Sequence, residues 1–417
     1  MNPNTIGKMR SSRFTSQLLL LLLTAFYLLY KVPIVAYYVN TYVALLLFLL
    51  TLVFFVLYRL NLLTRSPIIL PVMLVYICFN IFDLWWSGSS IINTIWSAFL
   101  LFLPVCMGVF IIYGKMDYIV RVAAPLMIVL YVITAITTYV GLLQSPEASR
   151  LMAADPTAYL RYYPYNIGSF NFIYSFVLLH PLMICVLKAK KMTLLAVALS
   201  VIGGLCVIQS EYTTATLLLM ISCVAYLFPS NISKGKLYWR GYLAVIILVA
   251  VLLFLPAMLD ALAELDMFLG SADKLHDVAG VLRGGKAEEA STQARIRVYQ
   301  LSWETFLAHP IFGVRLFNLG KSGGHSFVLD TLAEWGVVGF SLVVVLYYCF
   351  RKMHRQISGN TVASYYALLF FGMVIVICLL NPHAWIFELG LGAPLLLRYA
   401  VLVNEGGKKI MPTKRQG

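Results

Sequence analysis

Long, uninterrupted apolar runs constrain the fold of this chain more than any other feature. Leu18 to Leu23 and Val43 to Leu57 lie in two of them, and a helix needs about 20 mostly apolar residues to cross a bilayer. Hydrophobic residues make up 61% of the sequence and charged residues 12%, whereas a soluble domain averages about half and about a quarter. The composition excludes an ordinary soluble enzyme, a disordered chain and a disulfide scaffold, and indicates a polytopic membrane protein.

We predict an all-α polytopic integral membrane protein with about twelve transmembrane helices. Lipid offers no partner for an unpaired backbone N–H, so each run is expected to be a helix. An outer-membrane barrel would instead show short alternating strands. The predicted spans are 14–31, 41–58, 67–82, 91–113, 122–142, 167–187, 192–209, 212–229, 240–257, 326–350, 361–380 and 385–403.

The basic residues predict the orientation. The chain carries a formal charge of +14. Placing the N-terminus inside puts 21 of the 31 lysines and arginines on one side of the membrane. The positive-inside rule then gives an N-in, C-in topology with one large outer loop between helices nine and ten. Since topology accounts for most of the charge, a nucleic-acid partner is not expected. The predicted parts are helices one to nine in 1–256, the outer loop in 257–325, and helices ten to twelve with a cytoplasmic tail in 326–417.

Two outer segments gather polar residues, and these segments are where function is expected. The first, Leu143 to Asn166, contains Arg150 and Arg161 beside a cluster of tyrosines that includes Tyr162 and Tyr163. The second runs from Ala257 to Gly324 and is longer than any other connection. In it, Met258 to Leu269 is typical of a helix on the membrane surface, Gly280 to Gly285 of a break, and Ser291 to Leu307 of an amphipathic helix.

Two arginines of the amphipathic helix differ in their position relative to its apolar stripe. Arg295 lies at the edge of the stripe, where a cation needs an anionic partner or a route to water. Arg297 lies nearly opposite and has the pattern of a solvated surface cation. A functional role and a surface role both remain open for Arg295 at this point.

His325 precedes the tenth predicted span, and Asp330 and Glu334 lie in the first turns of that helix. A helix N-terminus favours a phosphate, and an imidazole that titrates near neutrality can accept a hydroxyl proton. The alternative is that His325 only caps the helix, with two acids placed to suit the helix dipole. His383, in the short outer turn 381–385, is a further candidate for the same cavity. No pair of histidines or cysteines has metal-ligand spacing, so we expect neither a metal nor a cofactor.

The segment from Arg295 to Gly339 resembles the O-antigen ligase/polymerase family. The motifs are Arg295, the aromatic Tyr299, the His309–Gly313 turn, Gly324-His325-Ser326, and the Glu334-Trp335-Gly336-Val337-Val338-Gly339 pattern. Each motif alone is weak, but their order and spacing together are fairly specific. The predicted twelve-helix layout with its large ninth loop also matches the family.

The resemblance implies a GT-C-like, metal-independent glycosyltransferase that uses a glycan linked to undecaprenyl pyrophosphate as donor and inverts the anomeric carbon. It implies that His325 is the base on the acceptor hydroxyl and that Arg295 binds the pyrophosphate. In place of the arginine that many members carry after helix seven, this chain has Ser210-Glu211-Tyr212-Thr213. The second phosphate cation is then Arg150, Arg161 or Arg297, of which we favour Arg161, because Tyr162 and Tyr163 are suited to stacking on sugars. Arg315 is a further candidate contact, and Asp330 or Glu334 is expected to orient His325.

We therefore predict a polymerase of cell-surface polysaccharide, such as O-antigen, capsule or exopolysaccharide. It would lie in the bacterial inner membrane with its active site at the outer, periplasmic face. One alternative is a ligase that moves the glycan to lipid A core or protein, and another is a flippase or transporter of lipid-linked oligosaccharide. The expected partners are the lipid-linked donor and acceptor and the bilayer, with a chain-length regulator and a flippase as candidate protein partners.

Overall fold

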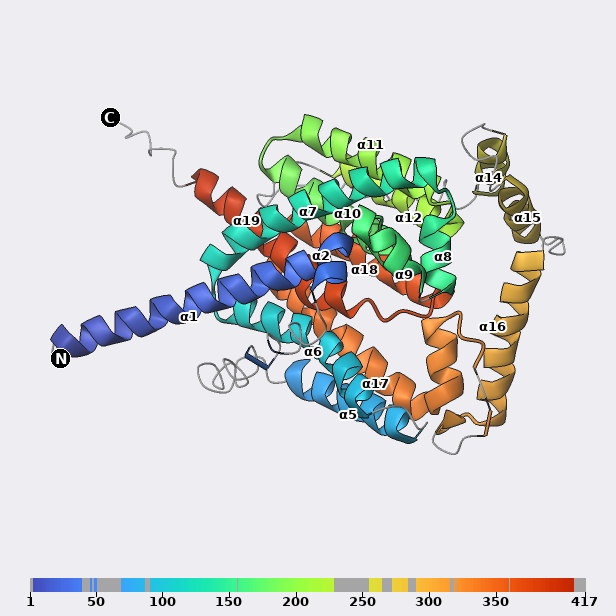
Figure 1. The fold of residues 1–417 in the computed structure, drawn as a ribbon, viewed down its shortest axis with the longest axis horizontal. Coiled ribbons are helices and arrows are strands. Elements are labelled where there is room, and N and C mark those ends of the chain that lie inside the picture. The colour runs from blue at the N-terminus through green and yellow to red at the C-terminus, as the bar shows by residue number, and fades with distance from the viewer. Residues whose placement is uncertain are drawn as a thin grey trace.

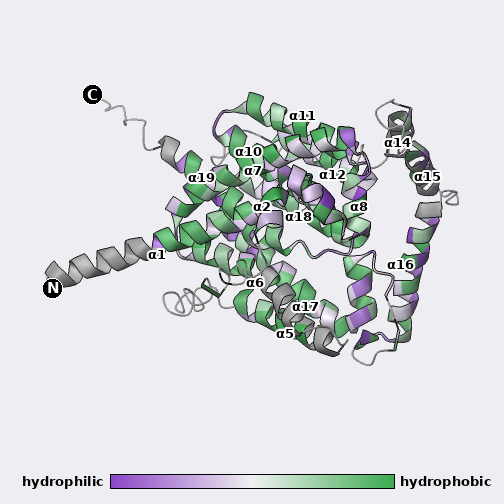
Figure 2. Cartoon of the chain, in the orientation of Figure 1, coloured by the Kyte–Doolittle hydropathy of each residue, from purple (hydrophilic) through white to green (hydrophobic). Residues whose placement is uncertain are grey.

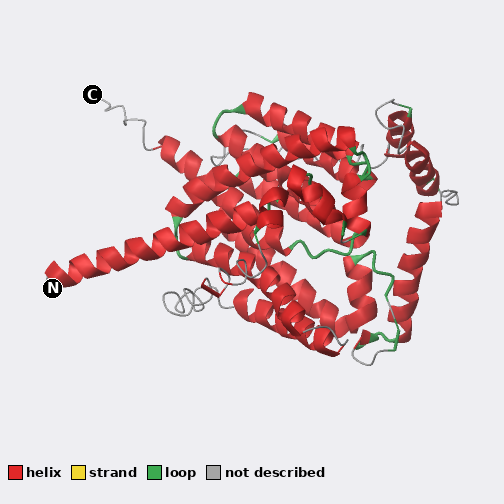
Figure 3. Ribbon diagram, viewed as in Figure 1, coloured by secondary structure: helices red, strands yellow, loops and turns green. Residues whose placement is uncertain are grey.

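All the regular secondary structure in the residues that the computed structural model describes is helical, and loops and turns connect the helices (Figure 3). The described residues are 3–39, 46, 49–50, 69–86, 91–155, 157–228, 255–264, 272–283, 290–315, 319–320, 322–359 and 361–408. The prediction of an all-α fold is therefore confirmed for these residues. The predicted spans 41–58 and 240–257 lie almost entirely outside them.

The helices are labelled in Figure 1. Those of the first half are α1 (Pro3–Tyr30), α2 (Pro33–Tyr38), α5 (Ile69–Trp86), α6 (Ile91–Tyr113), α7 (Asp117–Gln144), α8 (Ala148–Ala154), α9 (Ala158–Tyr162), η1 (Tyr163–Tyr165) and α10 (Phe170–Ala189). Those of the second half are α11 (Thr193–Gln209), α12 (Thr213–Cys223), η2 (Val224–Leu227), α14 (Leu255–Ala263), α15 (Ala272–Leu282), α16 (Ala290–Ala308), α17 (Phe327–Ser358), α18 (Ala363–Leu380), η5 (Glu388–Gly392) and α19 (Ala393–Lys408).

Helix α10 forms the centre of the bundle. Every residue from Ile173 to Lys188 is buried, and α11, α12, α18 and α19 all pack against it. A helix that is apolar all round has to be surrounded by other helices or by lipid, and Figure 2 shows that apolar residues dominate the bundle. His180 lies within α10, where its two ring nitrogens bond to the hydroxyls of Ser222 (2.6 Å) and Ser200 (2.8 Å).

Four of the described helices are long and apolar enough to cross a membrane by length and composition: α7, α10, α17 and α18. Shorter apolar helices are found within α1, α5, α6, α11 and α12. The predicted span 212–229 becomes α12 and the 3-10 turn η2, and the predicted span 326–350 becomes the longer α17. The start of α1 and the end of α19 extend from the same side of the bundle (Figure 1).

The described part of the long outer loop contains the helices α14, α15 and α16, and the residues after α16 form turns and irregular structure. Helices α14 and α15 pair with each other, and their buried residues Leu259 and Leu275 belong to one small apolar cluster. The surface helix predicted over 258–269 overlaps α14, which ends at Ala263. The break predicted over Gly280 to Gly285 begins too early, because α15 includes Gly280 and ends at Leu282. A helix predicted over 291–307 is confirmed as α16, which runs along the side of the bundle opposite the start of α1 (Figure 1). Two residues of its predicted apolar stripe, Trp303 and Leu307, are exposed.

The π-helix η5 is held tightly against α6. A Cβ atom added at Gly108 would lie 1.8 Å from the carbonyl oxygen of Gly390, so the two backbones meet without room for a methyl group. A π-helix displaces carbonyl groups from their usual partners, and here the Leu389 carbonyl accepts a hydrogen bond from His354 Nε2 at 2.8 Å. These contacts fix the position of the residues at the start of η5.

We expect Gly108→Ala to destabilise the protein by about 1–3 kcal/mol, because the added methyl group forces α6 and η5 apart. Gly204→Ala is the matched control, since a Cβ there meets only one atom of Leu219, at 4.0 Å. The measurement is thermal unfolding of the purified proteins in one detergent. Equal midpoints for the two variants would contradict the close contact.

Candidate active site

Helix α17 is interrupted near its N-terminal end, and the interruption organises the candidate site. Gly336 has non-helical dihedral angles (φ 60°, ψ −164°), which divide α17 into a short arm and a long helix. The turn His309–Gly313, which follows α16, lies in this break. Directly after the turn, the Val314 N–H donates to the Ala333 carbonyl at the end of the short arm (3.1 Å).

The turn also binds the start of the long helix. The Val337 N–H donates to the Pro310 carbonyl (2.9 Å), and the Val338 N–H donates to the Ile311 carbonyl (3.2 Å). The first N–H groups of a helix lack partners within the helix, and the turn supplies two of them. The turn therefore stabilises the break through backbone atoms.

Two glycines make this close approach possible. Gly313 and Gly336 both have positive φ (67° and 60°), a conformation that favours glycine. A Cβ at Gly313 would lie 2.2 Å from the Glu334 carbonyl oxygen, and a Cβ at Gly336 would lie 2.2 Å from the Ile311 carbonyl oxygen. Gly313, at the end of the turn, and Gly336, in the Glu334–Gly339 pattern, thus form the two sides of one backbone contact.

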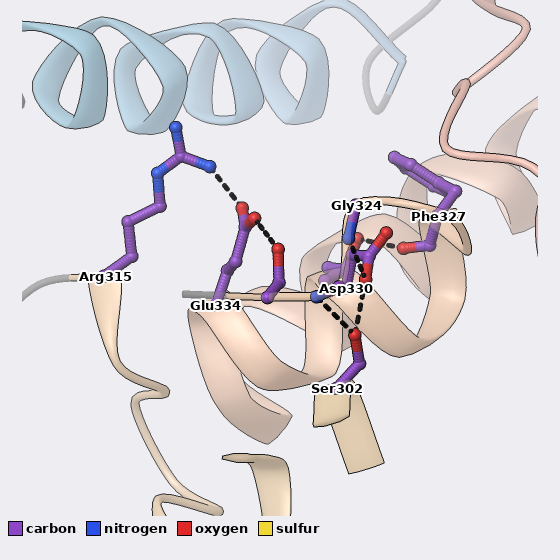
Figure 4. Close-up of polar contacts among 9 residues, drawn as sticks. Ser302, Arg315, Gly324, Phe327, Asp330 and Glu334 are labelled. Atoms are coloured by element: carbon purple, nitrogen blue, oxygen red, sulfur yellow. Dashed lines mark hydrogen bonds and ion pairs between the residues drawn. The ribbon is translucent and has the colours of Figure 1, made fainter. Parts of the chain in front are cut away.

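Asp330 fixes the loop that carries His325. Its buried carboxylate accepts hydrogen bonds from Ser302 Oγ (2.6 Å), the Gly324 N–H (3.1 Å) and the Ser326 N–H (2.8 Å), as Figure 4 shows. The Ser326 side chain in turn caps α17 by accepting from the Leu329 N–H (3.2 Å). A buried carboxylate needs such donors to offset its desolvation. Asp330 therefore holds the backbone on both sides of His325.

Glu334 lies one turn further along α17 and binds a different set of groups. It forms an ion pair with Arg315 and accepts a hydrogen bond from Ser322 Oγ at 2.5 Å (Figure 4). The Arg315 guanidinium also lies over the Trp335 ring, 5.8 Å from its centroid. Asp330 and Glu334 are thus both held by loop residues that follow α16.

A cavity of about 430 Å³ opens beside these carboxylates. Its polar walls come from Arg315, Asp330, Thr331 and Glu334 on one side and from His383 on the other. The remaining lining residues are Tyr76, Leu101, Gly324, Phe327, Trp335, Gly339, Leu342, Val343, Pro382 and Ala384. Its volume is typical of a small-molecule site. Within the described ranges, no three His, Cys, Asp or Glu side chains form a group that could hold a metal ion.

His383 brings an imidazole into this cavity from the turn between α18 and η5. Its ring packs against Phe170 (5.1 Å between centroids) and Trp385 (5.5 Å), and burial lowers its pKa. A lowered pKa keeps the ring neutral at pH 7, so it can donate or accept a hydrogen bond. The sequence placed His383 in an outer turn but gave no spacing that linked it to Glu334.

His325 and the two arginines of α16 are exposed. Gly324, next to His325, lines the cavity. The charge of Arg295 acts on Tyr299 and on Tyr174 at the start of α10. Burial raises the pKa of Tyr299, and Arg295 opposes this shift.

The predicted residues of the first outer segment lie apart from the lining of this cavity. Arg150 forms an ion pair with Glu211 (2.7 Å), and Arg161 lies over the ring of Tyr162, 5.2 Å from its centroid. Tyr162 is buried in a small cluster with Leu142, Ala148, Met152 and Ile167. Tyr163 lines a second cavity. The structure thus brings together Arg315, Asp330 and Glu334, and it places Arg150, Arg161, Tyr162 and Tyr163 elsewhere.

The described helices that are long and apolar enough to cross a bilayer define the class as a multi-pass membrane protein, with a polar cavity beside an interrupted helix. Residues 195–344 match the family model of O-antigen ligase. This match includes α16, the turn, and α17 through its break, and it confirms the resemblance to the O-antigen ligase/polymerase family. No curated protein matches the chain.

We expect Gly336→Ala to remove the docked turn and with it most of the activity, because the new Cβ would overlap the Ile311 carbonyl and the positive φ adds strain. Gly372→Ala, in the middle of α18 with no atom within 4 Å of the new Cβ, is the control. Limited proteolysis of the segment 309–326 measures the docking directly. The same cleavage rate in both variants would contradict the proposed contact.

Proposed function

We propose that this protein is a polysaccharide polymerase of the bacterial plasma membrane. It transfers a glycan from undecaprenyl pyrophosphate to a lipid-linked repeat unit at the outer face. The observation that carries the proposal is the polar cavity whose charged lining residues, Arg315, Asp330 and Glu334, all fall in the region matched by the O-antigen ligase model. Arg315 is the cation of this lining that we propose for contact with the leaving pyrophosphate.

The proposed reaction is one displacement with inversion. The acceptor hydroxyl gives its proton to His325 while its oxygen bonds to the anomeric carbon. The bond from that carbon to the pyrophosphate oxygen breaks, and its electron pair leaves with the pyrophosphate. Asp330 acts as a positioning residue, because it binds the N–H groups of Gly324 and Ser326 on both sides of His325.

Arginine is the suitable cation for the leaving group, since its guanidinium binds phosphate through two parallel N–H bonds. We assign this role to Arg295, which is exposed beside Tyr299. Arg315 is the second cation that we propose, because it lines the cavity, and its pairing with Glu334 holds it in one orientation. Like Arg295, the other three candidate arginines are absent from the cavity lining. Arg150 and Arg161 are weaker candidates because Arg150 pairs with Glu211 and Arg161 lies over the Tyr162 ring. Arg297 is weaker because it lies nearly opposite the apolar stripe of its helix.

A ligase that transfers the finished glycan to lipid A core or protein is the second candidate, favoured by the description of the matched family model. Both reactions use the same donor and break the same bond. They differ in the acceptor, so the glycan products distinguish them. A flippase is the candidate of another class.

Deleting the gene should collapse the surface glycan from a ladder to single repeat units, and a His325→Ala copy should fail to restore the ladder. The measurement is gel analysis of the surface and lipid-linked glycan pools, with the level of each protein checked in the membrane. Long chains that accumulate on the lipid carrier would indicate the ligase. An unchanged ladder would favour transport.

His276→Ala is the matched control for this experiment. His276 is another exposed histidine of the outer loop, and its Nδ1 bonds to Asp260 at 2.9 Å on the α14–α15 pair. The His276→Ala variant should restore a normal glycan ladder in the deletion strain. Normal elongation by His325→Ala would exclude His325 as the base.

Arg295→Lys keeps the positive charge but loses the bidentate hydrogen bonding of the guanidinium group. We expect a loss of about 1–3 kcal/mol in transition-state stabilisation, as for a charge-assisted hydrogen bond. The measurement is the rate of glycan transfer with purified enzyme. Arg283→Lys, at an exposed arginine that pairs with Asp260, is the control. Equal rates for the wild type and Arg295→Lys would place Arg295 outside the site.

A further inference from the structure

A second cavity, of about 290 Å³, is lined by a later part of the segment that follows α18. Pro382, His383 and Ala384 line the first cavity, whereas Phe387 and Glu388 line the second. Its other walls come from the α1–α2 connection, α7, η1 and the start of α10, and they are rich in hydroxyl and amide groups: Tyr30, Tyr131, Thr134, Tyr163, Ser169, Asn171 and Ser175. The site described above uses none of these groups.

Glu388 is the acidic group of this cavity. It is 5% exposed and is the first residue of the π-helix η5. Ser175 lines the same cavity, and its hydroxyl is 2.6 Å from the Tyr131 hydroxyl. A carboxylate inside a membrane bundle is costly and usually marks a functional site. π-Helices are also frequent at functional sites.

Lys31 supplies the cationic group. It lies in the connection between α1 and α2, where its ammonium is 5.0 Å from the ring centroid of Phe387 and 5.4 Å from that of Tyr27. The charge of Glu388 acts on Lys31. The cavity therefore combines a cation suited to a phosphate with a carboxylate and hydroxyls suited to hydroxyl groups.

The helices that form the cavity present apolar side chains to the outside. Tyr38 of α2 is 73% exposed, and Leu29, Ile34 and Ile133 are exposed on α1, α2 and α7. A polar cavity beside an exposed apolar surface fits an amphipathic molecule whose tail stays in the bilayer. The volume is close to the lower end of small-molecule sites, about 300 Å³, which suits one sugar ring or a glycerol headgroup.

We propose that this cavity binds the headgroup of a phosphorylated lipid that carries hydroxyl groups, with Lys31 at the phosphate and Glu388 at the hydroxyls. The lipid comes either from the bilayer, as phosphatidylglycerol, or from glycan assembly, as a polyprenyl-phosphate sugar. The second source rests on the proposed function, because joining two lipid-linked glycans requires a second headgroup site beside the first.

The experiment is native mass spectrometry of the purified full-length protein. Its probes are phosphatidylglycerol, undecaprenyl phosphoglucose and phosphatidylcholine, whose headgroup has a phosphate but no hydroxyl. We expect Glu388→Gln and Lys31→Met to weaken binding of one of the first two lipids at least tenfold. The control is Lys190→Met, since the Lys190 ammonium also lies over an aromatic ring (Tyr399, 5.1 Å) but outside the cavity.

Asn171→Trp is a second variant that keeps the test decisive if a charge substitution impairs folding. Asn171 is exposed on the cavity wall, so the larger side chain fills the cavity without entering the core. The Asn171→Trp variant should also weaken lipid binding at least tenfold. Equal binding of all three lipids by the wild type, or unchanged binding by folded Asn171→Trp, would overturn the proposal.

Preference for phosphatidylglycerol would support a bilayer lipid as the ligand, and preference for undecaprenyl phosphoglucose would support a second substrate site. The glycan ladder of the gene deletion is measured separately. If the ladder collapses on deletion but lipid binding is insensitive to these variants, the proposed function stands and this inference fails. If the variants weaken lipid binding but the gene deletion leaves the ladder unchanged, this inference stands and the proposed function fails.

Discussion

The contact between the His309–Gly313 turn and the break in α17 determines how the rest of the candidate site is arranged. Because the contact consists of backbone hydrogen bonds and two glycines, it joins the end of the outer loop to a bundle helix at a fixed distance. The short arm of α17 then has a direction of its own. Asp330 and Glu334 lie on this arm. Gly324 and Ser326 of the following loop bind Asp330, and Ser322 binds Glu334.

The two carboxylates show how burial and hydrogen bonding give similar residues different roles. Asp330 is buried and accepts bonds from one hydroxyl and two backbone N–H groups, so it stabilises the loop conformation. Glu334 is paired with the Arg315 guanidinium, which makes the same cavity wall carry both charges. A carboxylate fixed by donors does not reorganise when charge develops nearby, and such preorganisation favours catalysis.

The sequence predicted the helical class, the helix α16 and the region of the site, because apolar periodicity and the motif spacing are local properties. It also placed Asp330 and Glu334 correctly in the first turns of α17. It did not predict that Gly336 breaks this helix, because helices tolerate a glycine, and the break depends on a turn more than 20 residues earlier in the chain. Nor did it predict the cavity formed by Lys31 and Glu388, whose residues are more than 350 positions apart and meet only through tertiary packing.

The backbone contact at Gly313 and Gly336 also has a consequence for how this sequence can vary. When a larger residue clashes with a side chain, a smaller residue at the second position can restore the fit. Here each glycine faces a carbonyl group of the opposite segment, and a carbonyl group is present whatever residue occupies that position. A change at either glycine therefore has no compensating side-chain substitution across the contact, and selection for second-site suppressors would return true revertants or insertions that move a whole segment.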